Sequence, residues 1–171
     1  VLRTKGQEAH SAYPELGRSA VDAMVGLLAE LGALELPADP ELGETTINVG
    51  TIRGGSAANV FAGECEVEIM IRLVGDAQAV KGAIEGLVGN RADIEWGSHI
   101  PTQRFHVLRG FETTTVSYTS DVPLLAVWGR PLMFGPGSIQ HAHTEDEHVS
   151  VEELRSAVDT YARIARALLE S

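Results

Sequence analysis

Hydrophobic and polar residues follow a regular order over the first hundred positions of this chain. Residues 45–52 are rich in β-branched side chains, and residues 65–74 alternate apolar with polar side chains, as strands with one buried face do. Elsewhere apolar residues recur every three or four positions, as on the buried face of a helix. The pattern predicts strands over residues 1–8, 45–52, 65–74 and 93–99, and helices over residues 21–31 and 76–88. This β-α-β-β-α-β order is that of a ferredoxin-like fold of the α/β (α+β) class.

The last seventy residues have a less regular pattern. Thr113–Tyr118 and Pro131–Phe134 are expected to be strands, and Asp121–Val127 a short helix. A final helix begins after Ser150, because Ser150 and Glu153 have the spacing of a capping box. Its apolar residues are expected to form one buried face: Val151, Leu154, Val158, Tyr161, Ala165 and Leu168.

Pro101 marks the expected boundary between two domains, residues 1–102 and residues 103–171. Four elements in the second part make a thin core, so this part is expected to complete a larger structure. The chain opens in a predicted strand, at Val1, without an initiator methionine. We therefore expect a fragment of a longer protein.

Composition excludes several classes of partner. The chain has 13 Lys and Arg against 24 Asp and Glu, a net charge of −11 with the acids dispersed, so nucleic acid is not expected as a partner. The longest apolar run, Pro123–Phe134, is interrupted by polar and glycine residues and is far shorter than the roughly 20 residues of a membrane span. Cys65 has no other cysteine to pair with, which favours an inert thiol and a reducing, cytoplasmic location.

Residues 135–148 combine a Gly-Pro-Gly turn with three histidines and three carboxylates, and this combination predicts a metal site. The turn cannot continue a strand or a helix, so its backbone amides are free to face a ligand. His141 and His143 could form a metal-binding pair on one side of an extended segment. Alternatively, His141 and His148 are ordinary solvated loop residues.

Several motifs, in a fixed order along the whole chain, resemble the zinc-dependent family that includes acetylornithine deacetylase, succinyl-diaminopimelate desuccinylase, aminoacylase and carboxypeptidase G. They are Gly6–Ala12, Asn48–Gly55 with Asn59, Glu68–Arg72, Thr119–Asp121, and Gly135–Gly137 ahead of Ala142–Thr144. The resemblance implies that residues 1–102 are a ferredoxin-like lid that dimerises. It implies that residues 103–171 are the C-terminal segment of a mixed-sheet catalytic domain whose N-terminal half is absent here.

The resemblance also implies roles for single residues. His143 matches the histidine metal ligand in the loop before the last helix, and Glu145 replaces the proline common two positions later. His10 matches a catalytic lid histidine that reaches into the partner subunit and stabilises an oxyanion; otherwise it is a loop residue that caps the nearby helix. The substrate-binding positions are Asn59, Arg72, Thr119, Gly137 and Ser138. For Arg72, pairing with Glu64 or Glu66 is the alternative, and the glycine turn could be purely structural.

The activity that the resemblance implies is hydrolysis of the amide bond of N-acyl amino acids or small peptides by two zinc ions, with cobalt or manganese as alternatives. The glutamate base and most metal ligands of the family are not in this chain, so we expect the chain alone to be inactive and unable to hold both metals. A homodimer through the lid is expected. The alternatives are a non-enzymatic dimerising or small-ligand-binding module of ferredoxin-like fold, and a half that is complemented by a separate chain.

Overall fold

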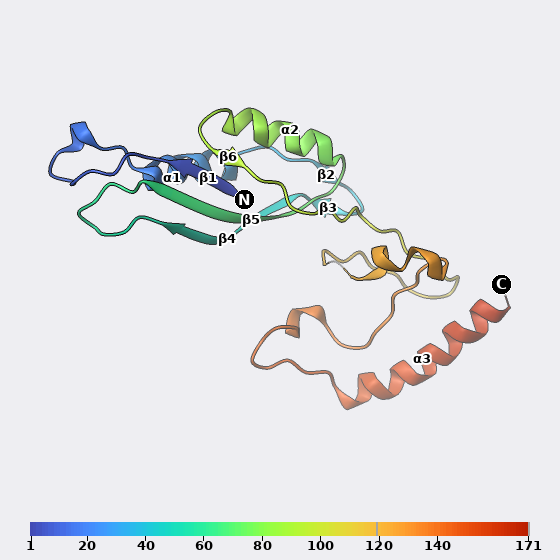
Figure 1. The fold of residues 1–171 in the computed structure, drawn as a ribbon. Coiled ribbons are helices and arrows are strands. Elements are labelled where there is room, and N and C mark those ends of the chain that lie inside the picture. Colours follow the sequence, from blue (N-terminus) through green and yellow to red (C-terminus); the bar gives the residue numbers. More distant parts are fainter. Residues whose placement is uncertain (119, 171) are drawn as a thin grey trace. The chain divides into compact units, whose positions relative to one another are not determined.

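The computed structural model describes residues 1–118 and 120–170, which form two compact units (Figure 1). The first unit comprises Val1–Thr102 with residues 115–118, and the second comprises Gln103–Thr114 with residues 120–170. Thr119, a predicted substrate-binding residue, lies outside the described residues. Among the described helices, none has the length and apolar character needed to cross a membrane.

The first unit contains a four-stranded antiparallel sheet in the order β4-β5-β1-β6. Its strands are β1 (Leu2–Lys5), β4 (Thr46–Gly54), β5 (Glu64–Arg72) and β6 (Asp93–Ile94), and the helices are α1 (Ala20–Gly32) and α2 (Ala77–Val88). Helix α1 follows β1, and α2 lies between β5 and β6. The predicted β-α-β-β-α-β order is therefore confirmed, with a two-stranded hairpin inserted after α1.

One core joins the two helices to the sheet. Its buried residues come from β1, α1, β5, α2 and the segment before β5: Leu2, Ala20, Met24, Leu31, Ala62, Cys65, Val67, Val80, Ile84 and Val88. Both helices begin at a side-chain cap, because Ser19 accepts from the Asp22 amide and Asp76 accepts from the Gln78 amide. Thr4 is buried in the same layer, and its hydroxyl donates to the carbonyl of Ala20 at 2.7 Å.

The opposite face of the sheet is charged, since successive strand residues point to opposite sides. Arg3 donates to Glu66 and to Glu95, each at 2.6 Å, and Lys5 donates to Asp93 at 2.9 Å. The hydrogen bond from Lys5 holds the pKa of the Asp93 carboxyl below its ordinary value. This face is polar and therefore suited to face a water-filled space.

The predicted element boundaries need three corrections in this unit. Residues 35–44, which lie outside the predicted strands and helices, contain a short hairpin, β2 (Ala38–Asp39) with β3 (Gly43–Glu44). Its turn is fixed by Asp39, which accepts two backbone amides, and by the positive φ of Gly43. β6 is far shorter than the predicted 93–99. β1 ends at Lys5, because the chain at Gly6 comes so close to other backbone that a Cβ there would lie 2.2 Å from the Arg18 carbonyl oxygen.

The second unit is built around helix α3 (Val151–Leu169), with short 3-10 helices at Val122–Trp128 and Ile139–His141. The capping box is confirmed: the Glu153 amide donates to Ser150 Oγ at 3.1 Å, and the Ser150 amide donates to Glu153 Oε2 at 3.2 Å. No strand occurs among the described residues after β6, so the strands predicted at Thr113–Tyr118 and Pro131–Phe134 are wrong. A strand needs a neighbouring strand for its backbone groups, and neither segment has one here.

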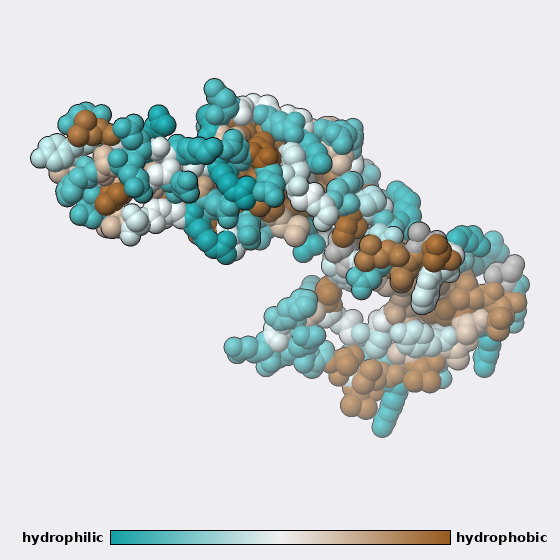
Figure 2. Space-filling view, in the orientation of Figure 1, coloured by the Kyte–Doolittle hydropathy of each residue, from teal (hydrophilic) through white to brown (hydrophobic). Residues whose placement is uncertain are grey.

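The predicted buried face of α3 is also largely exposed. Val151 is 63% exposed, Val158 66% and Tyr161 50%, whereas Ala157 and Ile164 are buried. Leu124, Val127 and Trp128 in the preceding 3-10 helix are more than four-fifths exposed, and Figure 2 shows apolar side chains gathered on the surface of this unit. The apolar residues of α3 do recur with a helical period, as predicted. The described residues of this unit, however, cover little of the face that they form.

Candidate functional site

His10 lies on a loop that leaves the sheet after β1 and returns at the start of α1. Two backbone hydrogen bonds close the base of this loop: the Gln7 amide donates to Arg18 at 2.7 Å, and the Arg18 amide donates to Gln7 at 3.0 Å. Gly17 lets the loop pass close to Phe61, because a Cβ there would lie 2.3 Å from that ring. The loop is thus anchored at its base and presents His10 in an exposed position.

The contacts of the His10 ring fix its donor nitrogen. Nδ1 of His10 accepts from the Ala12 amide at 3.1 Å. A neutral imidazole carries one proton, so that proton sits on Nε2 and can be donated to a ligand. Tyr13 packs edge-to-face against the ring, with centroids 6.4 Å apart. The prediction that His10 offers an N–H donor therefore has a local structural basis, and the ring accepts this amide within its own loop rather than at the start of α1.

Asn59 lies beside this loop, in the connection between β4 and β5. The Ser11 amide donates to the Asn59 carbonyl, and the Phe61 amide donates to the Ala9 carbonyl, each at 2.9 Å. These bonds join the His10 loop to the Asn59 segment side by side. Two predicted site residues that are far apart in sequence are thus neighbours at one end of the first unit.

Arg72 is the last residue of β5 and lies opposite Thr46 of β4. Its guanidinium donates to the Ser117 carbonyl at 2.8 Å. The alternative prediction, pairing with Glu64 or Glu66, is wrong, because Arg72 lies on the same strand as both and at least six positions from either. That spacing corresponds to roughly 20 Å along a strand.

Arg72 is therefore remote from His10 within one chain. The base of the His10 loop meets the beginning of β5, where the Gly6 amide donates to the Gly63 carbonyl at 2.7 Å. Arg72 is at the other end of this strand, eight residues beyond Glu64, a distance of roughly 26 Å. One small substrate cannot contact both side chains of the same subunit.

His143 occupies the loop before α3 and has a positive φ of 62°. Its amide donates to Glu147 Oε2 at 3.0 Å, and the Thr144 hydroxyl donates to the His141 carbonyl at 2.7 Å. The rings of His141 and His148 stack with centroids 4.3 Å apart. Among the described residues, no three His, Cys, Asp or Glu side chains gather in a metal-binding group, so the expected six-residue cluster does not form a complete site in this chain.

 Glu153 caps helix α3 and lies close to two of the loop histidines, His141 and His148. Hydrogen bonds from the Ser150 hydroxyl and amide hold the pKa of the Glu153 carboxyl below its ordinary value, and the charges of His141 and His148 act in the same direction. The carboxylate is therefore ionised at neutral pH, and its hydrogen bonds to Ser150 fix the start of α3.

Gly137 and Ser138 form the turn ahead of this loop. Gly137 has a positive φ of 88°, and a Cβ there would approach Val149 to 3.3 Å, so the position suits glycine. The Ser138 hydroxyl accepts from the Gln140 amide at 3.2 Å and caps the 3-10 helix that follows. The turn therefore has a structural role, and its role in substrate binding stays a prediction.

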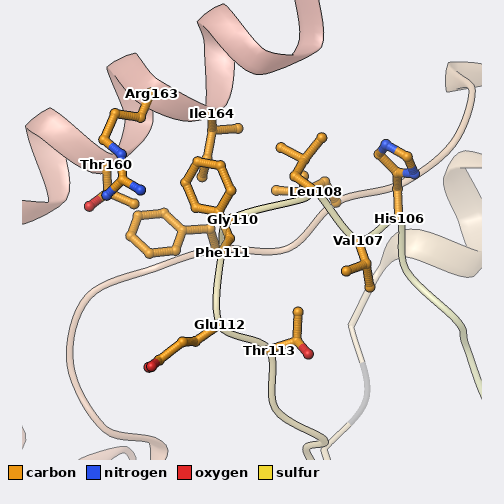
Figure 3. A pocket seen from close by; sticks show the side chains of 12 residues that line it. His106, Val107, Leu108, Gly110, Phe111, Glu112, Thr113, Thr160, Arg163 and Ile164 are labelled. Carbon is orange, nitrogen blue, oxygen red and sulfur yellow. The ribbon is translucent and has the colours of Figure 1, made fainter. Parts of the chain in front are cut away.

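A hollow of about 400 Å³ lies elsewhere in the second unit, between α3 and residues 106–113 (Figure 3). Arg163 of α3 lies over the Phe111 ring, 4.8 Å from its centroid, and Ile164 lines the same hollow. None of the predicted site residues that the structure describes lines this hollow.

Glu147 is one of the three carboxylates counted in residues 135–148, but its hydrogen bond to the His143 amide was not predicted. The available signal was its place in a loop four residues after His143, because a carboxylate near a turn commonly accepts backbone amides. The sequence also gave no sign that His141 and His148 would stack.

An antiparallel sheet with two helices on one face and a polar opposite face defines a ferredoxin-like α/β module. Residues 1–94 match the family described as the peptidase dimerisation domain, M20 type. The chain belongs to this family.

Relatives and solved structures agree with this assignment. A protein of Aspergillus clavatus named "Probable carboxypeptidase" is 37% identical over 190 residues, which cover 96% of this chain and 42% of that protein. A "Peptidase M20 domain-containing protein" of Schizosaccharomyces pombe is 33% identical over 162 residues, covering 93% of this chain and 40% of that protein. The chain thus spans less than half the length of these relatives.

The structure of aminopeptidase PepT from Bacillus cereus has a similar fold, with a TM-score of 0.61 and 24% identity over 91% of this chain and 47% of that chain. The predicted fold class and the family resemblance are confirmed by these findings.

Proposed function

We propose that this chain is the dimerisation lid and the C-terminal catalytic segment of a metal-dependent hydrolase that cleaves the amide bond of N-acyl amino acids or small peptides. The family match and the relatives named as carboxypeptidase support this proposal. The exposed apolar face of α3 supports the assignment of the second unit, because a larger catalytic domain would cover it. The buried, unpaired thiol of Cys65 suits a reducing compartment such as the cytoplasm.

His143 fits the role of one zinc ligand. Its imidazole is exposed, and neutral imidazole is among the ligands that zinc prefers. Two zinc ions, when bound, would polarise the scissile carbonyl and activate a water molecule. A catalytic zinc takes about three protein ligands, so the rest of the set must come from outside this chain.

The chain alone is therefore proposed to be inactive. Purified 171-residue protein, supplied with zinc, is expected to leave N-acetyl amino acids and dipeptides intact in an assay for released amine. Hydrolysis that co-purifies with this chain would overturn this part of the proposal.

The remaining predicted residues bind the substrate. His10 presents its Nε2–H to the oxyanion that forms as the amide carbonyl is attacked. Arg72 has the planar fork that pairs with a substrate carboxylate, after exchange of its hydrogen bond to Ser117. The Gly137 and Ser138 amides are proposed to face the substrate, and Asn59 and Thr119 to contact it.

One observation carries the proposal furthest: His10 and Arg72 lie at opposite ends of the lid. Since one substrate cannot reach both in the same subunit, each active site of a dimer would take Arg72 from its own lid and His10, with its neighbour Asn59, from the partner subunit. The site is then incomplete without a second copy of the chain.

The lid has a surface suited to such pairing. β4 is an edge strand of the sheet, and edge strands pair readily with another copy. Ile52 of β4 is 56% exposed and Val25 of α1 is 60% exposed. We propose that these elements form the homodimer across a twofold axis.

Mixed dimers test this arrangement. Two variants of the complete gene product, His10→Ala and Arg72→Ala, are each expected to be inactive as homodimers. After mixing, unfolding and refolding together, about a quarter of the wild-type rate is expected, because half of the dimers are mixed and each mixed dimer holds one intact site.

The same experiment can refute the proposal. If His10 acts within its own subunit, every site of a mixed dimer lacks one residue, and no activity returns. Refolded wild-type protein is the control for recovery, and sedimentation shows whether dimers have formed.

A further inference from the structure

The loop that carries His143 is closed on itself. The first contact joins Thr144 to the His141 carbonyl, and the second joins the His143 amide to Glu147 Oε2. The third is the stack of the His141 and His148 rings, which brings the two ends of residues 141–148 together. His143 therefore sits at the centre of a loop held at both ends.

The ring stack has a defined geometry. The two imidazoles lie 26° from parallel, with centroids 4.3 Å apart. His148 Nδ1 donates to the Asp146 carbonyl, because a carbonyl oxygen can only accept. This bond fixes the orientation of the His148 ring and hence the plane against which His141 packs.

The backbone at His143 needs such support. Its φ of 62° is in the left-handed region, which residues other than glycine seldom adopt. Conformations of this kind persist where the surrounding contacts impose them. Without closure of the loop, the backbone can relax and the His143 side chain changes direction.

We propose that His141 and His148 are positioning residues, whose stacked rings hold the His143 imidazole in the direction required for a metal ligand. This inference rests on the proposed function, in which His143 binds zinc. The stack acts through the loop, and neither ring needs to touch the metal.

Zinc affinity of the complete gene product tests the proposal, measured by competition with a chelator. His148→Ala removes the stack and is expected to weaken zinc binding by about twofold to tenfold, the range that corresponds to loss of one aromatic pair. His148→Phe keeps a ring without the bond to Asp146 and is expected to restore most of the affinity. His99→Ala, which removes an exposed histidine from the first unit, is the matched control and is expected to have no effect.

A second measurement does not involve the metal. In metal-free protein, amide hydrogen exchange over residues 141–148 is expected to be faster in His148→Ala than in wild type, and to return towards wild type in His148→Phe. His141→Ala is expected to match His148→Ala, and the double variant to be no worse than either, because both changes remove one interaction.

The outcomes separate this inference from the proposed function. Wild-type protein that binds no zinc refutes the proposed function. Zinc binding that is equal in wild type and His148→Ala refutes the positioning role alone. Equal losses in His148→Ala and His148→Phe would assign the effect to the bond with Asp146 and overturn the stack as its cause.

Discussion

Replacing Val158 by alanine should have opposite effects in this chain and in the complete gene product. Val158 lies on α3 and is 66% exposed here. Alanine favours a helix over valine by up to about 0.7 kcal/mol. In the 171-residue chain the substitution is therefore expected to be neutral or slightly stabilising.

In the complete protein, the same face is expected to be covered. Valine has two more carbon groups than alanine, each worth about 0.8 kcal/mol when buried. Full burial of both groups is therefore worth about 1.6 kcal/mol, and an unfilled cavity adds to the loss. The complete protein should thus be destabilised by about 1 kcal/mol after the gain in helix propensity is subtracted from these terms.

Hydrogen exchange over residues 151–169, together with urea unfolding, measures both effects. Ile164→Ala is the control, because Ile164 is 8% exposed and should cost about 2–5 kcal/mol in either context. If Val158→Ala has the same small effect in the complete protein, the face is not covered there, and the reasoning about the second unit is wrong.

Three further predictions concern the fold. Gly6→Ala should destabilise the first unit by about 1–3 kcal/mol or more in urea unfolding, because the added Cβ would lie 2.2 Å from a backbone oxygen. Gly26→Ala is the control: this position on α1 faces open space, so alanine should stabilise the unit by about 1 kcal/mol. Burial raises the pKa of the Cys65 thiol, so a thiol reagent should modify it much faster in urea than in buffer; equal rates would contradict its burial. Ser150 lowers the pKa of Glu153, so the stability advantage of wild type over Glu153→Ala should be present at neutral pH and be lost as the pH falls below about 4; an advantage that persists at pH 2 would contradict this.

The first unit could be predicted well from the sequence because its signals are local. The period-two pattern of residues 65–74 and the helical periods in 21–31 and 76–88 each describe one face of an element that packs on the shared core. The boundaries were less accurate, since they depend on contacts between distant segments. β1 stops where Gly6 meets backbone from elsewhere in the chain, and no local pattern encodes that approach.

The second unit was predicted less well, because its fold depends on contacts that the local pattern does not contain. Apolar periodicity over α3 predicts a buried face, but it does not indicate whether the residues that cover this face belong to the same chain. The capping box of Ser150 and Glu153 was predictable, because it involves only residues three positions apart. The strands expected at 113–118 and 131–134 failed, because a strand forms only beside another strand.

Sequence reasoning identified the candidate site residues but not their spatial relations. It did not indicate that His10 and Asn59 are neighbours, or that Arg72 is at the far end of β5. Both relations depend on the register of the sheet, because the register decides which loops pair and how far apart two residues of a strand lie. Sequence motifs do not indicate that register. The same is true of the stacked His141 and His148 rings.

Metal content of the complete gene product and of this 171-residue chain tests the central claim most directly. Both proteins would be dialysed against dilute zinc, washed, and analysed for bound metal, and then assayed with N-acyl amino acids. We expect about two zinc ions per subunit and amide hydrolysis for the complete protein alone. A complete protein that binds no metal and hydrolyses no amide would contradict the account and leave the dimerising module as the better description.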